Sequence, residues 1–425
     1  MSQQATPTDP QPPSGRRIFY GWYMVAATFA IMAISCGLGY YNLTVFLKAF
    51  VSYKGFSVET VSFATAIFSI SNGFTGLAVA WSIDRFDPRW VISAGAVVLA
   101  LSLISAGHVS THWELFLFYT VFGIGYASTS LVPCTTLVAR WFSRRRAQAL
   151  AVASTGLSFG GILFTPLAAS MIEKISFAPA TFWLSFFAML IIPVALLVLR
   201  PTPASMGLTP DGEELQRAPD GSVLPPAGLT LGEALRSRYF FLFTALFTLI
   251  FISQIGGLAH QFRLVAERTA NDHIGGTAVA VMAAFSIIGR LVGGFILSRI
   301  TTRQYLLALL FLQGTSYTLF AETYSVWGLM FCSALLGATV GNMQVMMPLM
   351  VAEGFGIKAY ARIFSVVQMI ATCLQAVGPI LIGVLYTRIG GYEIAYHALL
   401  GFTLISIVLA LKLGPTPMKM RGDSR

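Results

Sequence analysis

The sequence predicts an all-α membrane protein in which twelve transmembrane helices form two pseudo-symmetric six-helix halves. Of its 425 residues, 56% are hydrophobic and only 10% are charged, whereas soluble domains carry roughly 25% charged residues. Twelve apolar runs each reach about the 20 residues that a helix needs to cross a bilayer. The runs are too long and too uniformly apolar for the strands of a membrane barrel, so helices are the expected spanning elements.

The first half is expected at residues 20–199, after a polar N-terminal tail at residues 1–19. Charged residues separate its apolar runs. Lys48 follows the first run, Asp84 follows the second, Glu114 opens the fourth, and Arg144 precedes the fifth. Because charges are costly inside the hydrocarbon layer, they mark the ends of six spans at residues 21–47, 58–83, 90–109, 113–138, 147–172 and 180–199.

A segment at residues 200–238 interrupts this pattern of short loops. It is rich in proline and carries a cluster of acids, which indicates a cytoplasmic linker. The second half is expected at residues 239–413, before a C-terminal tail at residues 414–425, with spans at residues 239–261, 276–298, 304–322, 326–350, 361–386 and 393–413.

The two halves also repeat. The segment "ARWFSRRRAQAL" aligns with "AEGFGIKAYARI", and the same register places Pro166 on Pro379. Two repeated six-helix halves are typical of transporters whose substrate site lies between the halves, near the middle of the membrane.

The basic residues indicate how the chain is oriented. The net charge is +10, but most of the 27 Lys and Arg residues fall on one side when the N-terminus is placed in the cytoplasm, as the positive-inside rule expects. The basic excess therefore reports topology and not a nucleic-acid partner. We expect a multi-pass protein of a bacterial inner membrane, because the loops are short, with both termini in the cytoplasm.

Arg290 is the one basic residue expected in the middle of a span, within "FSIIGRLVGG". A central arginine costs about 2.5 to 3.5 kcal/mol on insertion scales. The acids of the predicted spans lie only near span ends, so no internal carboxylate is expected to neutralise Arg290. Its guanidinium fork matches carboxylate geometry, which favours a role in binding the carboxylate of a substrate. The alternative is a structural charge paired with an acid or with carbonyl groups.

Polar residues at helical spacing mark helix faces that are expected to point into the bundle. The fourth span carries Tyr119 and Tyr126 on one face, and the eleventh carries Gln368, Thr372 and Gln375. Tyr126, in "GIGYASTS", is the strongest candidate for a substrate cavity. Hydrogen bonding between helices is the alternative for each of these residues.

Four further residues are candidates for substrate binding. Tyr41 and Asn42 end the apolar part of the first span, where they offer donors to an anion or form part of an interfacial aromatic belt. His260, in "GGLAHQF", titrates near physiological pH, and its alternative is a packed or interfacial histidine. Gln344, in "GNMQVMMP", is a cavity candidate in the tenth span.

Several motifs resemble a known family. Twelve spans, a long central loop and the "DRFDPR" element after the second span resemble the major facilitator superfamily across nearly the whole chain. Within that superfamily, the segments "YGWYMV", "LTVFLKAF", "ARWFSRRRAQAL", "GRLVGG" and "AVGPILIGVLY", in this order, resemble the branch of monocarboxylate transporters and oxalate/formate antiporters. The resemblance implies the major facilitator fold, and it implies that Arg290 contacts the substrate carboxylate.

Two positions depart from the animal members of this branch. Ser286 stands where those members have an acid, and Tyr41 stands where they have a lysine; that acid and that lysine are tied to proton-linked transport in those relatives. Ser286 is therefore, like Tyr41, a candidate for substrate binding. The resemblance also implies that ion pairs on the cytoplasmic side hold one access state. The loop elements that form such pairs in the family are matched here by Asp84, Arg85, Arg89, Arg144, Arg145 and Arg146.

Together these observations predict a secondary active transporter of a small organic anion, a monocarboxylate, that works by alternating access and as a monomer. Protons or a counter-anion are the candidates for the coupled species. The alternative is an exporter of a neutral or cationic small molecule. We expect no enzyme activity, cofactor or metal site, because the chain has no H-E-x-x-H motif, no clustered carboxylates within its spans and no glycine-rich phosphate loop.

Overall fold

The computed structural model of the chain describes residues 19–212, 227–418 and 420. Within these residues, eleven helical segments are long and apolar enough to cross a membrane. The expected ninth span is also a helix, α13 (Thr302–Glu322), but Gln304, Gln313 and several hydroxylated residues lower its hydropathy. Most of the two expected tails and residues 213–226 of the expected linker lie outside the described residues.

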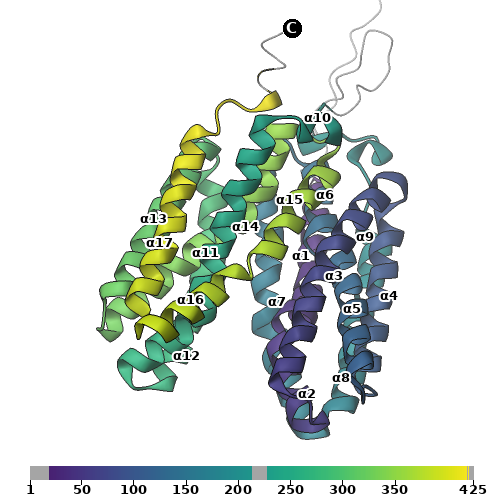
Figure 1. Cartoon of the computed structure of the whole chain (residues 1–425). Helices are drawn as coiled ribbons and strands as arrows, with labels where there is room; N and C mark the ends of the chain where they lie inside the picture. The colour runs from purple at the N-terminus through teal and green to yellow at the C-terminus, as the bar shows by residue number, and fades with distance from the viewer. Residues whose placement is uncertain (1–18, 213–226, 419, 421–425) are drawn as a thin grey trace, which may run out of the picture.

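The first bundle of helices comes from residues up to 198 (Figure 1). It consists of α1 (Gly21–Cys36), a π-helical turn (Gly37–Tyr41), α2 (Leu43–Lys54), α3 (Val58–Arg85), α4 (Pro88–Ala106), α5 (His112–Thr129), α6 (Leu131–Trp141), α7 (Arg146–Ile175), α8 (Phe177–Met189) and α9 (Ile191–Val198). Side-chain caps fix the start of several helices. The Ser57 hydroxyl accepts from the amide of Thr60 at 3.1 Å, and Asp87 caps α4, whose first residue is Pro88.

The second bundle follows two short 3₁₀ turns, Pro203–Met206 and Pro210–Gly212. It consists of α10 (Leu231–Leu235), α11 (Arg238–Thr269), α12 (Asp272–Ile296), α13, α14 (Val326–Phe355), α15 (Tyr360–Leu374), α16 (Val377–Ile389) and α17 (Tyr392–Lys412). Side chains of Ser237, Asn271, Thr301 and Ser325 likewise cap the starts of α11, α12, α13 and α14.

Prolines explain why three expected spans are broken into two helices. The α5–α6 break lies at Ser130, the α8–α9 break at Leu190, and the α15–α16 break at Gln375. A proline follows each break: Pro133, Pro193 and Pro379, respectively. Each break lies at the residue four positions before its proline, or one residue after that position. A proline ring clashes with the carbonyl of that position and cannot donate to it, so the helix is interrupted there.

Glycines allow helices to pack closely within each bundle. A Cβ atom at Gly156 or Gly160 of α7 would collide with backbone carbonyls of α1. In the second bundle, a Cβ atom at Gly337 or Gly341 of α14 would collide with backbone carbonyls of α12. Such spacing of small residues brings the backbones of membrane helices into contact, and it fixes the depth at which α1 and α12 are held.

Replacing Gly341 by alanine is expected to lower the stability of the purified protein. The new methyl group would meet the Ser286 carbonyl oxygen, so α14 must move away from α12 at a cost of about 1 to 3 kcal/mol. A clear fall in the thermal unfolding temperature in detergent would show this. Gly276→Ala on α12 is the matched control, because the space around Gly276 is open. Equal unfolding temperatures for the two variants would contradict the packing argument.

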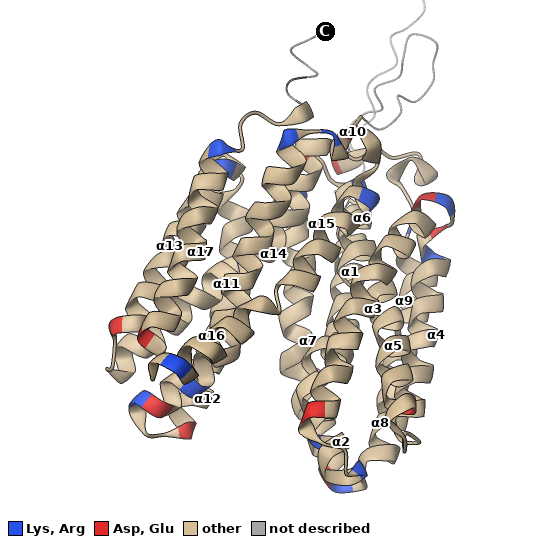
Figure 2. Cartoon of the chain, viewed as in Figure 1, with Lys and Arg blue, Asp and Glu red and all other residues tan. Residues whose placement is uncertain are grey.

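The two bundles lie closest together at one end and spread apart toward the other (Figure 1). We call the near end, where α10 and residues 200–212 lie, the linker end, and the other the far end. Across the bundle interface, α3 packs against α15 and α7 packs against α12 and α14. Figure 2 shows most charged residues at these two ends of the helices, which leaves an apolar middle zone as a membrane-spanning chain requires.

The described parts of the expected linker are fastened to both bundles. The Asp211 carboxylate accepts from the backbone amides of Ser143 and Arg144, at 2.8 and 2.6 Å, just before α7. On the other side of residues 213–226, the Leu229 amide donates to the Phe355 carbonyl at 2.8 Å, at the end of α14. The segment is therefore anchored at both of its described ends.

Candidate functional site

A cavity of about 130 Å³ lies between the two bundles. Two of the breaks in the helices border it, because Ser130 and Gln375 contribute to its walls, and so does the π-helical turn through Tyr40 and Tyr41. Irregular backbone at membrane depth is tolerated where it lines a cavity, and π-helical turns are frequent at functional sites. Two of the three breaks and the π-helical turn therefore border the cavity, whereas the break at Leu190 does not.

The two walls of the cavity differ in chemistry. The wall from the first bundle presents apolar surface at Phe68, Tyr126 and Leu157, and its polar side chains include those of Ser69, Asn72 and Ser130. The wall from the second bundle carries four amide side chains, those of Gln254, Gln344, Gln368 and Gln375. None of the described residues that line the cavity is charged. Any charge that acts on a bound molecule must therefore reach the cavity from behind this lining.

Arg290 of α12 supplies such a charge from the bundle interface. Its side chain is only 2% exposed. The Nε atom donates to the Gly341 carbonyl at 2.9 Å, and Nη1 donates to the Ser154 carbonyl at 2.9 Å and to the Ser158 hydroxyl at 2.8 Å. Arg290 thus joins α12 and α14 of the second bundle to α7 of the first.

One edge of the Arg290 guanidinium remains weakly bonded. Its Nη2 atom donates only to the Gln344 Oε1 atom, at the long distance of 3.4 Å. Gln344 lines the cavity, so this weakly used amino group lies just behind the cavity wall. No carboxylate among the described residues forms an ion pair with Arg290. The sequence left open whether Arg290 is paired with carbonyl groups. In the structure, two of its five N–H groups donate to carbonyls and a third donates to a hydroxyl.

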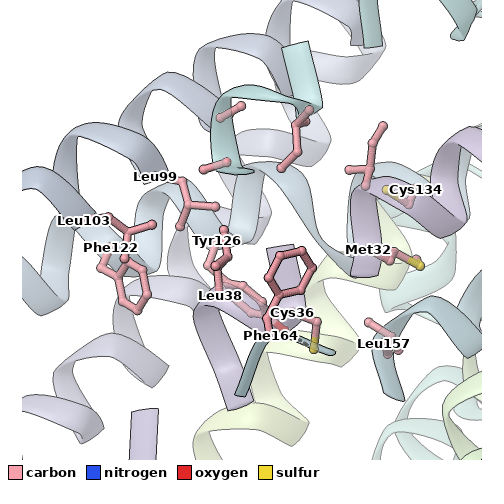
Figure 3. Close-up of a cluster of buried hydrophobic side chains, with 14 of the residues drawn as sticks. Met32, Cys36, Leu38, Leu99, Leu103, Phe122, Tyr126, Cys134, Leu157 and Phe164 are labelled. Atoms are coloured by element: carbon pink, nitrogen blue, oxygen red, sulfur yellow. Dashed lines mark hydrogen bonds between the residues drawn. The ribbon is translucent and has the colours of Figure 1, made fainter. Parts of the chain in front are cut away.

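Tyr126 and Tyr41 both line the cavity. The Tyr126 ring packs 5.4 Å from the Phe68 ring, and its hydroxyl lies 3.7 Å from the Cys36 sulfur. Figure 3 shows Tyr126 and Cys36 among apolar side chains that include Leu38 and Leu157. Tyr41 is 38% exposed and forms an edge-to-face pair with Tyr40, which also lines the cavity. Tyr41 therefore belongs to the cavity wall and not to an aromatic belt.

Among the expected polar stripes, the eleventh span keeps all of its members in the cavity wall. Gln368, Thr372 and Gln375 line the cavity, and the Gln368 Nε2 atom donates to the Thr372 hydroxyl at 3.0 Å. Gln344 lines it as well. The three residues of the eleventh span are those that the helical spacing grouped on one face, and Gln344 was predicted separately.

Besides Arg290, four predicted substrate-binding residues lie outside the cavity lining. Tyr119 is fully buried and packs against Phe50 and Phe118 in the core of the first bundle. Asn42 is also fully buried, at the start of α2. The helical spacing correctly assigned Tyr119 to the face that points into the bundle. Because the helix is tilted, that face borders the cavity at one depth and packs in the core one or two turns away, where Tyr119 lies.

The other two are His260 and Ser286. His260 lies near the far end, where its Nε2 atom is 3.2 Å from the Pro379 carbonyl. Ser286 is 4% exposed, and its hydroxyl lies 3.1 Å from the Ser158 hydroxyl at the α7–α12 contact. Ser286 is thus next to the residue that holds Arg290, and it is separated from the cavity itself.

Asp84, at the linker end of α3, bridges the two bundles. Its Oδ2 atom accepts from Arg362 Nε of α15 at 2.7 Å, and its Oδ1 atom accepts from Arg140 Nη2 of α6 at 3.1 Å. The Asp84 side chain is 14% exposed, so both ion pairs are partly shielded from water. The Asp84–Arg362 pair ties the first bundle to the second at the end where the bundles lie closest.

The predicted partners of Asp84 are not the ones that the structure brings to it. Arg85 stacks on the Trp81 ring at 4.3 Å, and Arg89 pairs with Asp87 at 2.6 Å. The backbone amides of Arg144 and Arg145 face the Asp211 carboxylate. Arg146 donates to the Phe142 carbonyl at 2.9 Å. Of the six residues predicted for the gate, Asp84 forms an ion pair between the bundles, whereas Arg85, Arg89 and Arg146 contact residues close to them in the chain.

Sequence reasoning missed three residues that complete these sites. Arg140 and Arg362 were counted only as topology signals, since nothing in the sequence links them to Asp84. Gln254, in the stretch "FISQIGG", is a polar residue inside an apolar run, and that pattern was a usable signal for a cavity residue.

Long helices in two bundles around a shared cavity are the architecture of a multi-pass transporter. The sequence profile described as the Major Facilitator Superfamily matches residues 29–266 and 258–424, so the chain belongs to this superfamily of membrane transporters. The resemblance inferred from the motifs, the predicted fold class and the exclusion of an enzyme are thereby confirmed.

Relatives and solved structures agree with this assignment. Human monocarboxylate transporter 7 is 22% identical, over 92% of this chain and 86% of its own length. Bovine monocarboxylate transporter 13 is 25% identical, over 91% and 87%. The crystal structure of the human organic anion transporter MFSD10 superposes with a TM-score of 0.68 at 16% identity, covering 94% of this chain and 100% of that chain. The E. coli fucose:proton symporter FucP gives a TM-score of 0.66 at 15% identity, covering 92% and 98%. These two structures support the fold alone.

Proposed function

We propose that the protein is a secondary transporter that moves a small organic monocarboxylate by alternating access of its two bundles. The observation that carries this proposal is Arg290, a buried cation beside the cavity that no described carboxylate neutralises. A charge at this depth is costly unless an anion compensates it. The names of the human and bovine relatives, both monocarboxylate transporters, support the same substrate class.

The contact with the carboxylate is expected at the Nη2 atom of Arg290. Its Nε and Nη1 atoms already donate to Gly341, Ser154 and Ser158, so the full fork is not available in this conformation. A substrate oxygen would accept from Nη2 in place of Gln344, whose bond is long. The Gln344 amide can then turn its own donor toward the same carboxylate. One arginine edge and one amide would thus hold the anion.

The conformation corresponds to an outward-facing state if the linker end is cytoplasmic, as the distribution of basic residues predicts. The Asp84–Arg362 ion pair keeps the linker end closed, and the bundles spread apart toward the far end (Figure 1). Access from the cytoplasm requires this pair to separate. It also requires α7 and α12 to part, and Arg290 bridges these two helices through Ser154 and Ser158. The substrate-binding arginine would therefore also belong to the moving interface.

The coupled species is either a proton or a counter-anion. Among the described residues, the cavity lining contains no acid or histidine, and Ser286 stands where animal relatives have an acid. Exchange of two anions needs only that both use Arg290 in turn, so the lining favours exchange. Uptake into proteoliposomes with and without a pH gradient distinguishes exchange from proton symport.

Ligand stabilisation tests the proposed function directly. A transported monocarboxylate is expected to raise the thermal unfolding temperature of the purified protein, because a ligand at 100 times its Kd adds about 2.7 kcal/mol of stability. The panel would contain short monocarboxylates, dicarboxylates, and neutral and cationic compounds of similar size. Stabilisation by a neutral or cationic compound, with no response to any carboxylate, would instead favour an exporter of such compounds.

A further inference from the structure

We propose that the transported anion is a short monocarboxylate that carries at least two hydroxyl groups, and that Gln254 and Gln368 accept hydrogen bonds from them. This inference rests on the proposed function, which supplies the carboxylate contact at Arg290. It concerns the glutamine side chains on the cavity wall formed by the second bundle.

Gln254 of α11 belongs to a buried network of amides and hydroxyls. Its Nε2 atom donates to the Gln313 Oε1 atom at 2.9 Å. The Gln313 Nε2 atom donates in turn to the Ser253 hydroxyl at 2.9 Å and to the Thr403 hydroxyl at 3.3 Å. Gln254 and Gln313 are 2% and 0% exposed, so the network is shielded from bulk water.

The hydroxyl groups decide which way both amides point. Ser253 donates its own proton to the Ile250 carbonyl at 2.8 Å, and Thr403 donates to the Leu399 carbonyl at 3.0 Å. Both hydroxyls can therefore act only as acceptors toward Gln313, which must present its NH₂ group to them. Its carbonyl oxygen then faces Gln254, and Gln254 must meet it with NH₂. Flipping either amide would place two donors or two acceptors together.

This orientation leaves the Gln254 Oε1 atom as the polar atom available to the cavity. Gln254 lines the cavity, and no described residue donates a hydrogen bond to its Oε1 atom. Gln368 of α15 is in a similar position. It lines the cavity and uses its Nε2 atom on Thr372, while its Oε1 atom is buried without a donor among the described residues. The wall thus presents two carbonyl oxygens that lack donors.

A ligand that supplies donors to both oxygens satisfies groups that would otherwise stay unpaired. Hydroxyl groups fit better than ammonium groups, because no acid lines the cavity and Arg290 already places a positive charge beside it. The opposite wall, with Phe68, Tyr126 and Leu157, offers apolar surface for the carbon skeleton. The cavity chemistry therefore matches a carboxylate at one end of a short hydroxylated chain.

A series of three-carbon acids tests the inference. Propionate, lactate and glycerate share the carboxylate and carry none, one and two hydroxyl groups. We expect the Kd, measured by thermal stabilisation of the full-length protein, to fall at least tenfold from propionate to lactate and again from lactate to glycerate. A site built to bond a hydroxyl discriminates strongly against an analogue that lacks it.

Two variants show which glutamine produces each of the two tenfold falls in Kd. Gln254→Met and Gln368→Met keep a similar side-chain volume and remove the acceptor, so each is expected to abolish one tenfold step and to leave propionate binding within about twofold. Gln261→Met is the matched control, since Gln261 is a buried amide of the same helix α11 that bonds to Ser333 and does not line the cavity. It should keep both steps even if it lowers stability.

The outcomes separate this inference from the proposed function. Equal binding of the three acids by the wild-type protein, or unchanged steps in both variants, would overturn the role of the hydroxyl groups and leave the carboxylate site intact. Failure of all three acids, together with stabilisation by glycerol, would overturn both proposals, because binding would then need no carboxylate.

Discussion

Replacing Arg290 by lysine is expected to lower transport of the monocarboxylate about 100-fold. The ammonium group keeps the charge but has no planar fork. It cannot hold Gly341, Ser154 and Ser158 as the guanidinium does and still present a donor beside Gln344. Hydrogen bonds to a charged group are worth about 1.5 to 3 kcal/mol, and about 2.7 kcal/mol corresponds to a factor of 100 in rate or affinity. Initial uptake rates and ligand stabilisation measure the two effects.

The readouts distinguish substrate binding from a structural role. If Arg290 binds the carboxylate, Arg290→Lys should abolish stabilisation by monocarboxylates while the unliganded protein still unfolds cooperatively. If Arg290 is only structural, the unliganded protein should lose stability and the stabilisation by ligand should persist. Arg299→Lys is the matched control, because Arg299 lies just beyond the same helix and is exposed. It is expected to transport at the wild-type rate.

The sequence predicted the helices better than it predicted their contacts. Apolar runs of membrane-spanning length are a local property, so the starts of the spans could be placed to within a few residues. Two ends were placed too early, because α2 and α11 continue to Lys54 and Thr269, beyond the expected ends at residues 47 and 261. Pro133 and Pro379 in the sequence point to the interruptions at Ser130 and Gln375, but α7 and α14 continue through Pro166 and Pro348, so a proline alone does not predict a break. The π-helical turn that brings Tyr40 and Tyr41 to the cavity has no comparable signal, since only the packing of α1 and α7 determines it.

The candidate site shows the same division between local and long-range information. Arg290 stood out because a charge inside an apolar run is visible in the sequence. Its neighbours Ser154 and Ser158 lie more than a hundred residues away and look like ordinary small residues. Tyr119 and Tyr126 share one helical face, yet only Tyr126 reaches the cavity. Periodicity assigns a face to a residue, but the depth at which the face meets the cavity depends on how the bundles dock.

Neutralising Asp84 should slow transport and leave substrate affinity nearly unchanged. Asp84→Asn removes the ion pair with Arg362 of the other bundle. The Asp84 side chain is largely buried, but the Arg362 side chain is 42% exposed to water, which screens the pair. The pair therefore stabilises the closed linker end by only about 1 kcal/mol. The closed linker end would then be less favoured by about fivefold, and the uptake rate is expected to fall by a similar factor. The Kd should stay within about twofold, because Asp84 does not line the cavity.

Asp87→Asn provides the matched control in the same loop. The Asp87 carboxylate pairs with Arg89 of its own bundle at 2.6 Å; this bond holds the pKa of Asp87 below its ordinary value, although partial burial opposes the shift. Its loss should leave the transport rate close to that of the wild type. Equal effects of the two substitutions would mean that the loop matters only for folding.

A double-mutant cycle decides whether Asp84 acts through Arg362. If the pair holds the two bundles together, Arg362→Gln should slow transport as much as Asp84→Asn, and the double variant should be no slower than either. Additive effects would assign the gating role to the Asp84–Arg140 pair, which lies within one bundle and would act by fixing the end of α3. Either result identifies the contact that the change of access state has to break.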